Sequence, residues 1–105
     1  MNDDRPCIVM TALGSEEAAE TIAVAIVEAR LAACVQIHPV RSFYIWQGRL
    51  QRDAEWVLCA KTLGTHYTRL EALIRERHGY ELPEVLRLPV EGGSEDYLRW
   101  LRMED

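Results

Sequence analysis

The chain has 105 residues, of which 49% are hydrophobic, and it carries a formal net charge of −5 with a pI near 5.2. This length predicts a single domain over residues 1–105, whose core buries about two-thirds of the unfolded surface. An acidic balance without a clustered basic patch argues against nucleic acid as a partner.

The cysteines and the chain start indicate a compartment. Cys7, Cys34 and Cys59 are isolated among apolar residues and form no CxxC pair, so neither a zinc knuckle nor a thioredoxin-type motif is predicted. They are interpreted as small buried hydrophobes in a reducing environment. The acidic start does not resemble a signal peptide, and the longest apolar run is too short and too charged to span a bilayer. We therefore predict a cytoplasmic protein with no membrane partner.

The first predicted elements are a buried strand over residues 7–12 and a helix that begins after Ser15. Ser15 is a natural N-cap, and Glu16 and Glu17 place negative charge at the positive end of the helix. Apolar residues then recur every three or four positions and form one stripe against a sheet: Ala19, Ile22, Ala23, Ile26 and Ala29.

Residues 33–62 read as a long hairpin that reverses at Gly48, where a tight turn requires positive φ. Pro39 lacks an N–H donor and should lie on an edge strand or at a bulge. A strand over residues 33–46 would reach roughly 45 Å at about 3.3 Å per residue, so part of the hairpin must bend or project from the domain. A projecting hairpin with open edges predicts a symmetric oligomer.

The remaining elements are a second helix capped by Thr65 and ending at Gly79, a last core strand over residues 84–90, and a terminal helix capped by Ser94. The order is βαββαβ followed by a C-terminal helix. It predicts an α+β fold with an antiparallel sheet and helices on one face, which is the ferredoxin-like or split βαβ plan.

The segment from His78 to Glu84 places an imidazole, the Tyr80 phenol and two carboxylates beside a turn. Imidazole with carboxylate is suited to bind a divalent cation or a small ligand. The alternative is a structural corner, because Gly79 and Pro83 are also typical of a joint between a helix and a strand.

Other candidate groups are less tightly specified. The three histidines share no metal-ligand spacing, although in an oligomer one of them could face a neighbour's carboxylate or thioether, and Met10 would favour copper(I). Lys61 lies in an apolar strand and is expected either to pair with Glu55 or Glu84 or to snorkel to solvent. No phosphate loop, nucleophile elbow or spaced acid/base pair is present, so no enzyme is predicted.

In order along the chain, these pieces resemble the CutA divalent-cation tolerance family from about residue 8 to residue 101. The blocks that carry the resemblance are Thr11-Ala12, residues 30–35, Ser42, Tyr44, Trp46, Gly48, Glu55, Leu58, Lys61-Thr62, His78, Tyr80, Pro83-Glu84, Leu88-Pro89-Val90 and residues 97–100.

The resemblance implies a ferredoxin-like homotrimer with no obligatory cofactor, in which the long hairpins pair across subunits. Some members bind copper through cysteine and histidine, which implies a metal site at His78 with Met10 in place of the usual cysteine. This chain also has Gly79 where the family commonly has proline. The leading hypothesis is thus a non-enzymatic trimer that binds copper or another divalent cation.

A second hypothesis is a signalling or scaffold trimer whose cleft between subunits binds a small anionic metabolite or a protein partner. The residues predicted to line that cleft are Tyr44, Trp46, Glu55, Lys61, Tyr80 and Glu84.

Overall fold

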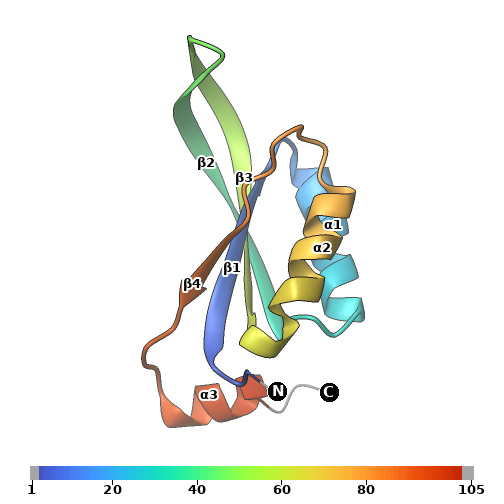
Figure 1. Cartoon of the computed structure of the whole chain (residues 1–105), viewed down its shortest axis with the longest axis vertical. Helices are drawn as coiled ribbons and strands as arrows, with labels where there is room; N and C mark the ends of the chain where they lie inside the picture. The colour runs from blue at the N-terminus through green and yellow to red at the C-terminus, as the bar shows by residue number, and fades with distance from the viewer. Residues whose placement is uncertain (1–2, 103–105) are drawn as a thin grey trace.

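The computed structural model describes residues 3–102. Its four strands form one antiparallel sheet with the order β2-β3-β1-β4 (Figure 1). The predicted α+β, ferredoxin-like order is confirmed. The elements in chain order are β1 (Pro6–Leu13), α1 (Glu16–Glu28), β2 (Cys34–Trp46), β3 (Arg49–Leu63), the short 3-10 helix η1 (Gly64–His66), α2 (Tyr67–Arg77), β4 (Leu86–Pro89) and α3 (Glu95–Arg102).

The core lies between the sheet and the pair of helices α1 and α2, which cover one of its faces (Figure 1). Alternate residues of the two central strands point toward these helices, as the two-residue period of a strand requires. Among the described residues 3–102, no pair of helices covers the opposite face of the sheet (Figure 1). The fully buried residues of the core cluster include Val9, Leu58 and Ala60 from the sheet and Ile22, Ile26, Leu70 and Ile74 from the helices.

Helix α1 begins as predicted, because the Ser15 hydroxyl accepts a hydrogen bond of 3.1 Å from the backbone N–H of Ala18. The predicted Thr65 cap of the second helix is wrong. Thr65 lies inside η1, and α2 has His66 at its N-cap position with no side-chain cap bond. The backbone N–H of Thr65 instead donates to the carbonyl of Asp3 at 2.7 Å, which ties this turn to the start of the chain.

The β2–β3 hairpin projects beyond the rest of the sheet, as its length predicts (Figure 1). The molecule measures 44 × 25 × 25 Å along its principal axes. Gln47 and Gly48 have φ values of 52° and 79°, and positive φ at both central residues is the requirement of a type I′ hairpin turn. Pro39 lies in the outer strand β2, where the prediction of an edge position is confirmed.

Strand β4 differs from the prediction of a core strand over residues 84–90. Only Leu86–Pro89 are extended, and all four of these residues are exposed. The reason is position: β4 pairs with β1 at the outer edge of the sheet and runs away from α2 (Figure 1). Val85 alone packs partly against the core from this region.

Helix α3 crosses the end of the molecule farthest from the hairpin tip (Figure 1). The predicted cap is present, since the Ser94 hydroxyl accepts a bond of 3.3 Å from the N–H of Tyr97. No helix within residues 3–102 is long and apolar enough to cross a membrane.

Candidate functional site

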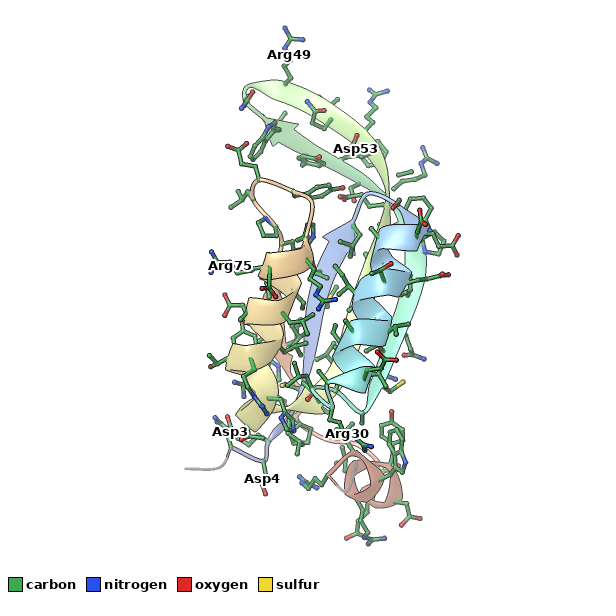
Figure 2. All side chains as sticks on the ribbon, turned by 90° about the vertical axis from the view of Figure 1, so that its right-hand side faces the viewer. Asp3, Asp4, Arg30, Arg49, Asp53 and Arg75 are labelled. Atoms are coloured by element: carbon green, nitrogen blue, oxygen red, sulfur yellow. The ribbon has the colours of Figure 1, made fainter. Side chains whose placement is uncertain are left out.

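A cavity of about 750 Å³ lies where the base of the projecting hairpin meets the end of β1 and the loop that follows α2. Figure 2 shows that loop reaching up to the underside of the hairpin, with Arg49 pointing into solvent at the tip and Asp53 closer to the domain. The cavity is lined by Ala12, Ser42, Phe43, Tyr44, Trp46, Asp53, Glu55, Gly79, Tyr80, Glu81, Leu82 and Glu84.

The hairpin side of this cavity is formed by residues that alternate onto one face of β3. Glu55 lies opposite Val40 and Asp53 lies opposite Ser42 in the antiparallel register, so the two carboxylates share one face of β3. That face is opposite to the one covered by α1 and α2, because its neighbours Leu58 and Ala60 point into the core. The loop after α2 crosses to this side and completes the wall.

Tyr80 joins the loop to the hairpin. Its hydroxyl donates a hydrogen bond of 2.8 Å to Oε2 of Glu55, a residue that is 7% exposed. Burial, and then the hydrogen bond to the Glu55 carboxylate, raise the pKa of Tyr80 well above its usual range, so the phenol stays neutral and keeps donating. The Tyr80 ring passes close to Gly14, where an added Cβ would lie 3.1 Å from the phenol oxygen.

A second phenol–carboxylate pair lies nearer the tip. Tyr44 donates to Oδ2 of Asp53 at 2.5 Å, and this bond raises the pKa of Tyr44 to about 12. With Glu81 and Glu84, four carboxylates line the cavity, whereas none of its lining residues is Lys, Arg or His. The cavity is therefore electronegative, which favours a cationic ligand and disfavours the predicted anionic metabolite.

His78 is held by both of its ring nitrogens. Nε2 lies 2.8 Å from the carbonyl oxygen of Ala12, and Nδ1 accepts a bond of 3.2 Å from the backbone N–H of Tyr80. A carbonyl can only accept, so Nε2 donates to Ala12 while Nδ1 accepts from Tyr80. His78 would have to give up one of these bonds to bind a metal ion. Its role in this geometry is to fix the loop that carries Tyr80.

The other predicted metal ligand, Met10, lies directly opposite Cys59 of β3 and Leu86 of β4. No group of three or more His, Cys, Asp or Glu side chains arranged to hold a metal occurs within residues 3–102. Metal binding at His78 with Met10 stays a prediction, one that this geometry does not favour.

The structure brings five of the six predicted cleft residues to the cavity: Tyr44, Trp46, Glu55, Tyr80 and Glu84. Lys61 is the exception. It lies opposite Cys34, and its Nζ is 5.7 Å from the centre of the Tyr97 ring of α3 rather than beside Glu55 or Glu84. Sequence reasoning missed Asp53, although its two-residue spacing from Glu55 on the returning strand is the signal that could have found it.

Comparison with known proteins decides the family. The model of the family described as "CutA1 divalent ion tolerance protein" matches residues 7–104. The chain belongs to the CutA1 family. A CutA1-family relative from Thermus thermophilus, named divalent-cation tolerance protein CutA, is 44% identical over 96 residues, covering 90% of this chain and 93% of the relative.

Solved CutA1 structures share the fold closely. The Thermus thermophilus structure has a TM-score of 0.90 at 42% identity and covers 94% of this chain and 97% of that one. The Synechococcus elongatus structure has a TM-score of 0.91 at 36% identity, covering 99% and 93%. The names of these CutA1 relatives describe cation tolerance and carry no enzymatic activity.

Some CutA1 relatives are longer and come from several compartments. The chain spans about half of the human protein CutA (50%) and of the Arabidopsis thaliana protein (53%), the latter named chloroplastic. An Archaeoglobus fulgidus CutA structure is titled periplasmic. The family thus occurs in more than one compartment.

Proposed function

We propose that this CutA1-family protein is a non-enzymatic homotrimer that binds divalent cations, and that the cations enter the acidic cavity. The observation that carries the proposal is the lining, with four carboxylates and no basic side chain around a cavity of about 750 Å³. The names of the relatives, which describe divalent-cation tolerance, support the same ligand class.

The cavity suits hard cations. Carboxylate oxygens are preferred ligands of Mg²⁺, Ca²⁺ and Mn²⁺, and Mg²⁺ usually keeps several waters while it is held by one or two carboxylates. Asp53 and Glu55 lie on one face of the same strand and each uses one oxygen for a tyrosine. Binding of a partly hydrated ion therefore requires no chelate of three protein ligands.

The alternative within this function is a copper site at His78 with Met10. It requires breaking one of the two hydrogen bonds of the His78 ring. Copper(I) would gain a thioether and an imidazole there, and the loop after α2 would lose its attachment to Ala12 or to Tyr80.

The homotrimer is supported by what the hairpin exposes. Phe43 is 58% exposed, Ile45 66% and Leu50 55%, all near the tip of a hairpin that projects from the domain. The outer edge of β2 also pairs with no other strand of residues 3–102. Apolar side chains beside an open strand edge are stabilised by pairing with a further copy.

Cys7, Cys34 and Cys59 are free thiols, which supports the predicted reducing, cytoplasmic compartment.

The test is calorimetric titration of the wild-type protein and its variants with Mn²⁺ and, in anaerobic reducing buffer, with Cu⁺, alongside native mass spectrometry for the assembly. We expect Asp53→Asn to weaken Mn²⁺ binding by about fivefold, since loss of a nearby charge is worth about 1 kcal/mol. Asp4→Asn is the matched control, because it removes the same charge from an exposed position outside the cavity.

Equal effects of Asp53→Asn and Asp4→Asn would reduce the binding to general attraction by an acidic protein and would overturn the cavity assignment. Loss of Cu⁺ binding in both His78→Ala and Met10→Leu, with Asp53→Asn unchanged, would establish the alternative site. A monomeric mass would contradict the trimer.

A further inference from the structure

We propose that the acidic cavity is shaped to bind an organic cation with a guanidinium group, in addition to the inorganic cations of the proposed function. The inference rests on that proposed function in one respect, that the same cavity takes up cations. It names a ligand class for the aromatic part of the lining, which metal ions do not use.

The carboxylate of Glu55 offers an open hydrogen-bond acceptor to the cavity. Glu55 is 7% exposed, and its Oε2 is taken by Tyr80. Its Oε1 accepts no hydrogen bond from any residue between 3 and 102, yet among these residues the only fully buried side-chain atom without a partner is Oγ1 of Thr11. Oε1 of Glu55 is therefore still accessible. A carboxylate this deeply placed gains most from a charged donor in the cavity.

Asp53 supplies a second open acceptor on the same strand face. Asp53 likewise uses Oδ2 for Tyr44 and leaves Oδ1 without a partner in the described part of the chain. Two carboxylates from one strand face, each with a free oxygen, match the fixed fork of a guanidinium, which has five N–H donors. A metal ion held by these two carboxylates would gain no third protein ligand, because residues 3–102 contain no group of three His, Cys, Asp or Glu side chains that could hold a metal.

Aromatic rings form part of the cavity wall. Tyr44, Trp46 and Tyr80 line the cavity, and Tyr44 and Trp46 alternate onto the hairpin face that carries Asp53, whereas Phe43 borders the cavity from the other face of β2. A guanidinium is flat and weakly hydrated and stacks on aromatic faces, whereas a hydrated metal ion gains little from them. The chain already contains one such contact on the other face of β2, where the guanidinium carbon of Arg41 lies 5.8 Å from the centre of the Phe43 ring.

The cavity is large enough for an organic ligand. The cavity volume of about 750 Å³ falls within the range of about 300–1,000 Å³ that is typical of small-molecule sites. It is much larger than one ion with its first water shell. The cavity can admit an alkylguanidinium between the carboxylates and the rings together with several waters.

The experiment compares butylguanidinium with butylurea, its neutral isostere, by calorimetric titration of the assembled wild-type protein. We expect butylguanidinium to bind at least about tenfold more tightly, because only the cation satisfies the two carboxylates. Glu55→Gln and Asp53→Asn should each remove about fivefold or more of that preference. The Asp4→Asn variant should keep it.

A second variant separates the rings from the charges. Trp46→Leu keeps an apolar side chain at the hairpin and should weaken butylguanidinium about fivefold while Mn²⁺ binding is unchanged. N-acetyl-arginine amide presents the same group as a peptide does, so its affinity relative to butylguanidinium distinguishes a protein arginine from a free compound.

The outcomes are distinguishable. Mn²⁺ binding at Asp53 with no preference for butylguanidinium over butylurea would overturn this inference and leave the proposed function intact. A preference for butylguanidinium that depends on Glu55, Asp53 and Trp46, without Mn²⁺ binding, would support the inference and contradict the proposed function. Binding of neither cation would overturn both.

Discussion

Tyr80 donates its hydroxyl hydrogen to Oε2 of Glu55 at 2.8 Å, across a separation of 25 residues. This bond connects the loop after α2 to the middle of the long hairpin. It also satisfies one oxygen of a carboxylate that is 7% exposed. The position of the loop, and with it the shape of the cavity, therefore depends on a pair of side chains that are each ordinary in the sequence.

Replacement of Tyr80 by Phe should destabilise the protein. It keeps the ring and removes the bond, which leaves the Glu55 carboxylate with less compensation for its burial. We expect a loss of about 1–3 kcal/mol in the free energy of unfolding. Urea denaturation at fixed protein concentration measures it, because an oligomer's stability depends on concentration.

Tyr44→Phe is the matched control for that measurement. It also removes a phenol–carboxylate bond, but Tyr44 is 39% exposed and water can replace its partner. Its effect should stay below about 1 kcal/mol. A larger loss for Tyr44→Phe than for Tyr80→Phe would show that burial of Glu55 is not the decisive factor.

The architecture could be predicted because its signals are local and repeated. Ser15 and the apolar stripe containing Ile22 and Ile26 define α1, and the period of a strand defines β2 and β3. The predicted core strand at residues 84–90 was wrong for a reason that apolar content cannot reveal. Whether residues such as Leu86 and Leu88 are buried depends on what covers the edge of the sheet, and α2 does not reach them.

The cavity was predictable in part. Tyr80 and Glu55 were expected in one cleft, whereas their direct bond depends on the path of a loop that no periodicity fixes. Lys61 was expected either to pair with Glu55 or Glu84 or to snorkel to solvent. It is six residues beyond Glu55 in the same strand, and the ring of Tyr97 lies near it instead, which depends on how α3 folds back.

His78 should act as a support for the loop rather than as a metal ligand. His78→Ala removes the bond to the Ala12 carbonyl and the bond from the Tyr80 N–H. We expect a loss of about 1–2 kcal/mol of unfolding free energy, since both groups lie partly open to water. His38→Ala at an exposed position of β2 is the control and should change stability by less than about 0.5 kcal/mol. Equal effects of the two variants would contradict the support role.

The N-terminal segment should make stability depend on pH. Arg5, and then Arg87, hydrogen-bond the Asp3 carboxylate and hold its pKa well below the ordinary value of 3.8. A folded-state pKa below the unfolded value means that the ionised form favours folding. This contribution is present above about pH 4 and is lost as the pH falls from there toward the lower folded pKa.

Asp3→Asn should therefore lower the melting temperature near pH 7, and its difference from wild type should shrink as the pH falls below about 4. Thermal unfolding followed by circular dichroism at several pH values measures this convergence. Asp4→Asn is the control at the neighbouring exposed position. A difference between Asp3→Asn and wild type that does not change with pH would rule out the ionised Asp3 as its source.

The two buried threonines of the central strands should respond in opposite ways to replacement by valine. Oγ1 of Thr62 donates a bond of 2.7 Å to the carbonyl of Leu31, whereas Oγ1 of Thr11 is buried without a partner in the described part of the chain. Thr62→Val leaves the Leu31 carbonyl without its donor and should cost about 1–3 kcal/mol. Thr11→Val exchanges an uncompensated hydroxyl for a methyl group of similar size and should leave stability unchanged or raise it by about 1 kcal/mol.

Urea denaturation of both variants at one protein concentration makes the comparison. A loss for Thr11→Val as large as that for Thr62→Val would mean that the Thr11 hydroxyl has a partner in solution, such as a buried water.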